Sequence, residues 1–168
     1  MNNILEQLDR EGFIFKQYDP SIIDFHDLSS SISRLKSYIE EIISISGESL
    51  FYDIDTIEYK QQIKPHYHVI PGTFQVVAWI PEDNFEGRKF IFGTQKSLNT
   101  TTPKLGYFCI MKPNDPHFIH GVTSLQSKTS IRSIGFSSLI KKVEGNQDIF
   151  AQNPPTLFKD IPIESLIN

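Results

Sequence analysis

Four of the five histidines in this 168-residue chain fall into two short clusters. His66 and His68 stand in KPHYHVIPGTF, and His117 and His120 stand in NDPHFIHGV. Residues i and i+2 of an extended chain project to the same face, so His66 and His68 can both point into one cavity. Because imidazole is a common metal ligand, the pair is a candidate metal site; the alternative is a pair that is exposed or separately hydrogen-bonded.

The second cluster can supply a third ligand. The stretch PKLGYFCIMKPNDPHFIHGV is typical of a strand, a turn with Pro and Asp, and the start of the next strand. Antiparallel pairing could return one histidine beside the first pair and complete a facial set of three ligands with open positions. The odd spacing of His117 and His120 lets only one of them share the ligand face. We expect this to be His120, which lies deeper in the apolar run, and we expect His117 to lie at the surface or beside the ligands.

Arg132 is the candidate anchor for an anionic ligand. In TSIRSIGFSS, strand alternation places Arg132, Ile134 and Phe136 on one face. An arginine buried on such a face needs an anionic partner, either from the protein or from a ligand carboxylate that its guanidinium can grip with two hydrogen bonds. The alternative is that this face is the solvent face of an edge strand.

The elements that must position these residues can be read from periodicity. The stretch DLSSSISRLKSYIEEIIS predicts an amphipathic helix capped by Asp27, with apolar residues at spacings of three and four: Leu28, Ile32, Leu35, Ile39 and Ile42. From residue 50 onward, short segments rich in aromatic and β-branched residues alternate with turn residues. The segment FQVVAWI is nearly continuous in its apolar character and predicts a central strand covered on both faces; the alternative is a turn of a buried helix.

These elements predict a mainly β fold of the α+β type, a jelly roll or double-stranded β-helix with an N-terminal helix packed on its sheet. We expect a single domain over residues 1–168. It would comprise an N-terminal helical segment over 1–48, a β core over about 50–140 and an irregular C-terminal strap over 141–168.

Composition excludes several classes of partner. The 16 basic and 20 acidic residues give a net charge of −4 with no basic tract, which argues against nucleic acid and anionic membranes. The start of the chain resembles no export signal, and the single cysteine, Cys109, lies in an apolar run. We therefore expect a cytoplasmic monomer or homodimer that acts on a small molecule.

Beyond these features, the order of the motifs resembles the catalytic core of the iron(II) and 2-oxoglutarate-dependent dioxygenases, especially their prolyl-hydroxylase-like branch. The resemblance spans roughly residues 56 to 137: Tyr59 in IEYKQ, then HYH, then FQVVAWIPEDNFEGRKFIFG, then the segment ending in FIHGV, then IRSIGF. It implies a double-stranded β-helix that uses Fe(II), dioxygen and 2-oxoglutarate to hydroxylate or otherwise oxidise a small-molecule or amino-acid-like substrate.

Carried over by position, the resemblance implies that His66 and His120 bind iron and that Arg132 holds 2-oxoglutarate. His68 occupies the place of the family's carboxylate ligand, and we expect it to bind the metal as a third imidazole. Three neutral imidazoles leave the site more positive than two imidazoles and a carboxylate, which would favour an anionic co-substrate.

Two aromatic residues complete the expected site. Tyr59 is a candidate for contact with the co-substrate, and Trp79 is a candidate neighbour of the metal ligands. Both are also typical of core packing, because aromatic residues at strand spacing pack by default.

Two other functions fit the same residues. One is a cupin-type metal protein that needs no 2-oxoglutarate, in which His66, His68 and either His117 or His120 hold iron, zinc or manganese. The other is a jelly-roll binding domain without catalysis.

Overall fold

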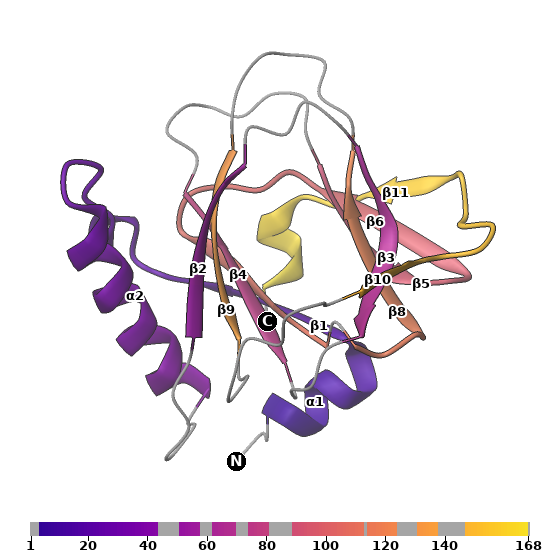
Figure 1. Cartoon of the computed structure of the whole chain (residues 1–168), viewed down its shortest axis with the longest axis horizontal. Coiled ribbons are helices and arrows are strands. Elements are labelled where there is room, and N and C mark those ends of the chain that lie inside the picture. Colours follow the sequence, from indigo (N-terminus) through magenta and orange to yellow (C-terminus); the bar gives the residue numbers. More distant parts are fainter. Residues whose placement is uncertain are drawn as a thin grey trace.

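The computed structural model describes residues 4–43, 51–57, 62–69, 74–80, 89–112, 114–123, 131–137 and 147–167. It is mainly β, with two sheets that face each other and an α-helix outside one of them (Figure 1). From β2 to β9, consecutive strands alternate between the sheets, except that the hairpin of β5 and β6 stays within one sheet. The chain therefore forms a β-sandwich.

The five-stranded sheet has β4 at its centre, as the apolar run FQVVAWI predicted. All its pairings are antiparallel. Its order is β1 (Phe13–Gln17), β7 (Tyr107–Met111), β4 (Gln75–Trp79), β9 (Ile131–Ser137) and β2 (Phe51–Ile57).

The six-stranded sheet carries both the HxH stretch and the strand of His120. Its pairings are antiparallel except for β11, which runs parallel to β6. Its order is β10 (Gln147–Phe150), β3 (Ile63–Val69), β8 (Phe118–Val122), β5 (Phe90–Thr94), β6 (Ser97–Thr101) and β11 (Phe158–Asp160).

Helix α2 (Leu28–Ile43) covers the outer face of the five-stranded sheet (Figure 1). It begins as predicted, with a carboxylate oxygen of Asp27 accepting the backbone N–H of Ser30 at 3.2 Å. Its apolar stripe packs in one cluster with strand residues such as Val76 and Phe108. The stripe includes three buried residues of the expected set: Ile32, Leu35 and Ile39.

A second core fills the space between the sheets. It joins aromatic rings of β1, β4 and β5 with Phe118 and with Ile163 of the short 3-10 helix η2 (Ile163–Leu166). Cys109 belongs to this core, and burial raises the pKa of its thiol well above the usual range. The cysteine therefore serves as a small apolar side chain.

Several elements differ from the sequence-based expectation. The segment assigned to an N-terminal helical region contains α1 (Ile4–Glu11), the 3-10 helix η1 (Pro20–Ile22) and a strand, β1, that pairs with β7. The segment expected to be irregular contains β10 and β11, which lie at opposite edges of one sheet. Partner strands distant in sequence complete these short strands, so local pattern does not reveal them. Within the described residues, no helix is long and apolar enough to cross a membrane.

Candidate metal centre

Strands β3 and β8 bring three histidines together. His66 and His120 are direct partners in the antiparallel pairing, so the return of a later histidine beside the HxH pair, expected from the sequence, is present. Tyr67 packs with the cluster on the outer face of the six-stranded sheet, which leaves His66 and His68 on the opposite face, toward the other sheet. The candidate ligand atoms of His66, His68 and His120 all lie within 4.8 Å of one another.

A glycine makes this approach possible. Gly121 follows His120 in β8, and a Cβ atom at this position would lie 2.5 Å from the carbonyl oxygen of Ile63 in β3. The pairing of β3 and β8 is irregular between Ile63 and His66, where β3 bulges. The glycine in FIHGV was a signal in the sequence, because a glycine inside a strand often marks a close approach of two backbones.

His66 has its tautomer fixed by the backbone. Its Nδ1 lies 2.7 Å from the carbonyl oxygen of Lys64. A carbonyl can only accept, so Nδ1 carries the proton, and Nε2 of the neutral ring has its lone pair available for a metal. Metal-binding histidines are commonly oriented by a hydrogen bond of this kind.

His68 and His120 face each other through their Nε2 atoms, which lie 2.9 Å apart. Two nitrogens bound at right angles to one ion at about 2.1 Å would be about 3.0 Å apart, so this separation suits a shared metal. The buried Nδ1 of His120 has no hydrogen-bond partner among the described residues. Three imidazoles are a donor set that suits iron, zinc or copper, so the residues fit a transition metal.

Burial favours the neutral form of His120. His66 and His120 are buried, and the ring centroids of the three histidines lie 4.5 to 4.8 Å apart. Burial lowers the pKa of His120 well below its usual range, and repulsion from His66 and His68 lowers it further. Imidazoles must be neutral to bind a metal, so this shift favours metal binding by His120.

Strand β10 lies beside the histidines, in the segment that was expected to be an irregular strap. Its register places Phe150 opposite His66 and Asp148 opposite His68. The ring centroids of Phe150 and His66 are 6.1 Å apart, so an aromatic side chain borders the cluster. The sequence signal was weak, because QDIF is too short to stand out as a strand.

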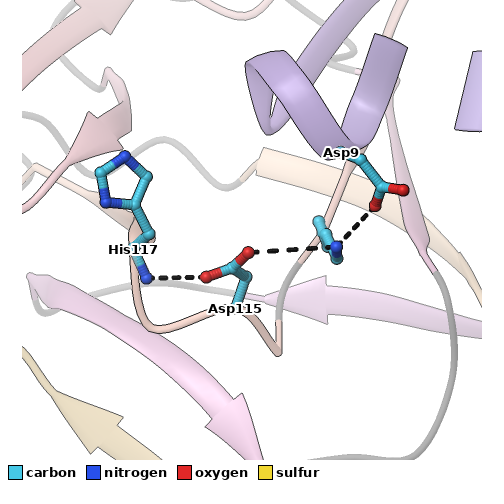
Figure 2. A network of polar contacts seen from close by, with 4 residues as sticks. Asp9, Asp115 and His117 are labelled. Carbon is cyan, nitrogen blue, oxygen red and sulfur yellow. Dashed lines mark hydrogen bonds and ion pairs between the residues drawn. The ribbon is translucent and has the colours of Figure 1, made fainter. Parts of the chain in front are cut away.

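His117 lies outside the cluster. It is exposed in the turn before β8, where its backbone N–H donates to a carboxylate oxygen of Asp115 at 2.9 Å (Figure 2). The other oxygen of Asp115 lies 4.0 Å from the ammonium of Lys112, which also pairs with Asp9 at 2.5 Å. These contacts lie in and beside the turn that leads into β8.

Of the two aromatic residues expected near the site, only Trp79 lies within the described residues. Trp79 is buried in the core between the sheets, where it stacks with Phe15, and its carbonyl accepts the hydroxyl of Tyr18 at 2.8 Å. Its described contacts are those of a core residue. Tyr59 lies outside the described residues, and its role stays a prediction.

The structure places Arg132 in β9 of the five-stranded sheet, and its side chain lies outside the described part of the chain. In the register of β9 with β2, Arg132 pairs with Thr56. The role of Arg132 as an anchor stays a prediction.

Comparison with known proteins gives a likeness of fold. No family model and no curated protein matches the sequence. Among solved structures, the chain is similar to a prolyl hydroxylase from Trichoplax adhaerens in complex with a hypoxia-inducible-factor oxygen-degradation-domain peptide fragment. The TM-score is 0.58 at 10% sequence identity, and the match covers 81% of this chain and 87% of that chain. At this identity the likeness shows the β-sandwich fold and leaves the activity open.

Proposed function

We propose that this protein is a non-haem iron oxygenase that uses dioxygen and 2-oxoglutarate to hydroxylate or otherwise oxidise an organic substrate. The observation that carries this proposal is the cluster of His66, His68 and His120 on the inter-sheet face of a sandwich whose fold is like that of a prolyl hydroxylase. Fold likeness alone would not support an activity, but a three-imidazole cluster with two buried members adds the chemistry.

The proposed core is a double-stranded β-helix. Strands β2, β4, β7 and β9 belong to one sheet, and β3, β5, β6 and β8 belong to the other. The chain crosses between the sheets in a palindromic order, with the β5–β6 hairpin in the middle, which supports this assignment.

In the proposed site, His66, His68 and His120 hold iron through ring nitrogens. When bound, iron(II) would supply the redox chemistry that couples the oxidation of 2-oxoglutarate to that of the substrate. The Lys64 carbonyl keeps the Nδ1 proton on His66 and so directs Nε2 toward the metal. Burial of His120 excludes water from one side of the site. Arg132 is the proposed contact for the distal carboxylate of 2-oxoglutarate, and Tyr59 is proposed to border the co-substrate.

The three-histidine donor set favours one second candidate function. Among the described residues the candidate ligands are three histidines without a carboxylate, and such a site can bind a metal without 2-oxoglutarate. The protein would then be a three-histidine metal protein or dioxygenase of the cupin type, which binds iron, zinc or manganese without 2-oxoglutarate.

An anaerobic titration separates the two candidates. Purified metal-free protein is titrated with Fe(II), with and without 2-oxoglutarate, and the weak visible charge-transfer band of the chelated co-substrate is measured. The proposed oxygenase gives a band that is absent from His120→Ala and weaker in Arg132→Ala. Iron binding that is indifferent to 2-oxoglutarate supports the second candidate, and the absence of any metal binding rejects both.

The variant His68→Asp tests the unusual ligand. It restores the carboxylate that the resemblance leads one to expect, so we predict that it still binds iron. Succinate formation after admission of oxygen then measures turnover of 2-oxoglutarate in wild type and variant. His117→Ala is the matched control, because this histidine is exposed and lies outside the cluster. Complete loss of iron binding in His68→Asp, with the fold intact, would argue against the proposed ligand set.

A further inference from the structure

A cavity of about 920 Å³ lies where the chain leaves β10 and crosses toward β11. Figure 1 shows this segment looping away from the six-stranded sheet before it returns as β11. One wall is the beginning of β3 with the residue before it, and the other is the end of β10 with the crossing segment. The volume falls in the range of about 300–1,000 Å³ that is usual for small-molecule sites.

The cavity offers an aromatic and proline-rich surface. Phe150 and Phe158 are 56% and 41% exposed, which is unusual for large aromatic side chains unless a ligand or partner covers them. Pro154 and Pro155 form much of the crossing wall. Proline rings and phenylalanine rings together favour a flat or branched apolar group.

Lys64 is the one charged residue among the described residues that line this cavity. Lys89, Lys104 and Lys112 each pair with a carboxylate, whereas Lys64 has no such pairing within the described part of the chain. An ammonium beside an apolar wall is complementary to an anionic group carried by an apolar body. The cavity is therefore chemically matched to an organic anion.

The same residues connect the cavity with the histidine cluster. Phe150 lines the cavity, and its ring centroid is 6.1 Å from that of His66. Lys64 lines the cavity, and its carbonyl accepts the Nδ1 proton of His66 at 2.7 Å. A ligand in the cavity would thus lie against the two residues that border and orient one candidate ligand of the metal.

We propose that this cavity binds a small organic carboxylate with an aromatic or branched aliphatic body, the carboxylate at Lys64 and the apolar body against Phe150 and Phe158. Binding itself does not depend on a metal. The further assignment of this ligand as the substrate to be oxidised rests on the proposed function.

Two fluorescent probes test the binding site in metal-free protein. Anilinonaphthalene sulfonate carries an anion on an aromatic body, and phenylnaphthylamine has the same rings without the anion. We expect Lys64→Met to lower the affinity for the sulfonate probe at least about tenfold, which corresponds to roughly 1.4 kcal/mol. The affinity for the neutral probe should change by less than about twofold. Lys96→Met is the matched control, because Lys96 is exposed in the β5–β6 turn and does not line the cavity.

The aromatic wall is tested separately. Phe150→Ala is expected to lower the affinity for both probes about tenfold. Phe150→Leu should lower it less, because leucine keeps part of the apolar wall. Phe25→Ala is the control, since Phe25 is an exposed aromatic residue remote in the sequence from the cavity walls. Unchanged affinity for the sulfonate probe in both Lys64→Met and Phe150→Leu would overturn the proposal.

Titration of the same variants with Fe(II) distinguishes a failure of the cavity proposal from a failure of the oxygenase proposal. Lys64→Met retains the backbone carbonyl that orients His66, so its iron affinity should stay within about threefold of wild type. Loss of probe binding with retained iron supports a separate ligand pocket beside the cluster. Probe binding in a protein that never binds iron would leave the pocket standing and reject the oxygenase.

Discussion

The Nε2 atoms of His68 and His120 lie 2.9 Å apart across neighbouring strands of the six-stranded sheet. Without a metal, one of these nitrogens must donate a proton to the other for the contact to be favourable. With a metal, both lone pairs can point at the same ion. A metal would therefore replace a shared proton, and the contact identifies the pair as the centre of the candidate site.

Metal binding should stabilise the folded protein. A divalent metal at about 100 times its Kd adds about 2.7 kcal/mol to the free energy of unfolding, which for this chain length raises Tm by roughly 5–10 °C. Differential scanning fluorimetry with Fe(II) or Co(II), reversed by a chelator, measures the shift. His120→Ala should lose it and His117→Ala should keep it. Equal shifts in the two variants would place the metal elsewhere.

Gly121→Ala should disturb the site through the backbone. The added methyl would lie 2.5 Å from the Ile63 carbonyl oxygen and 3.1 Å from the carbonyl carbon of Lys64, so β3 and β8 must separate. We expect a loss of about 1–3 kcal/mol in the free energy of unfolding, measured in urea. Metal affinity should fall at least about tenfold, because the Lys64 carbonyl orients His66. An unchanged urea midpoint together with an unchanged metal affinity would show that β3 and β8 do not approach closely at Gly121.

Tyr18 should make the stability depend on alkaline pH. Burial raises the pKa of its phenol to about 12, and its hydroxyl donates to the Trp79 carbonyl at 2.8 Å. The unfolded chain releases this proton near pH 10, so from pH 10 to 12 the unfolded state binds fewer protons and the free energy of unfolding falls.

The variant Tyr18→Phe isolates this contribution. At neutral pH this substitution should lower the free energy of unfolding by about 1–3 kcal/mol, because the buried Trp79 carbonyl loses its hydrogen-bond donor. The difference in the free energy of unfolding between wild type and Tyr18→Phe should shrink as the pH rises from 10 to 12. Urea denaturation at each pH measures it. A constant difference over this range would contradict the raised pKa.

The C-terminal helix η2 should be part of the core rather than a loose cover. Ile163 is 1% exposed and packs with the aromatic cluster between the sheets, whereas Leu157 in the crossing segment is 88% exposed. We expect Ile163→Ala to cost about 2–5 kcal/mol and Leu157→Ala to change the free energy of unfolding by less than about 0.5 kcal/mol. Similar small costs in both variants, measured by chemical denaturation, would show that η2 does not close the sandwich.

The sequence predicted the elements whose pattern is local. Helix α2 follows from apolar spacing and the Asp27 cap, and β4 follows from a nearly continuous apolar run. The shared face of His66 and His68 follows from strand alternation alone. Short strands such as β1 and β10 were missed, because their stability comes from partners that are distant in the chain.

By itself, the sequence determined which residues could do chemistry: two histidine clusters, one of them with ligands on a common face. Only the tertiary structure decided which of these residues meet. Strand pairing placed His120 opposite His66 and brought Phe150 of an unpredicted strand to the same cluster. The physical reason is that alternation fixes which side chains share a face of one strand, whereas register between strands, set by the whole core, decides which faces and partners they find.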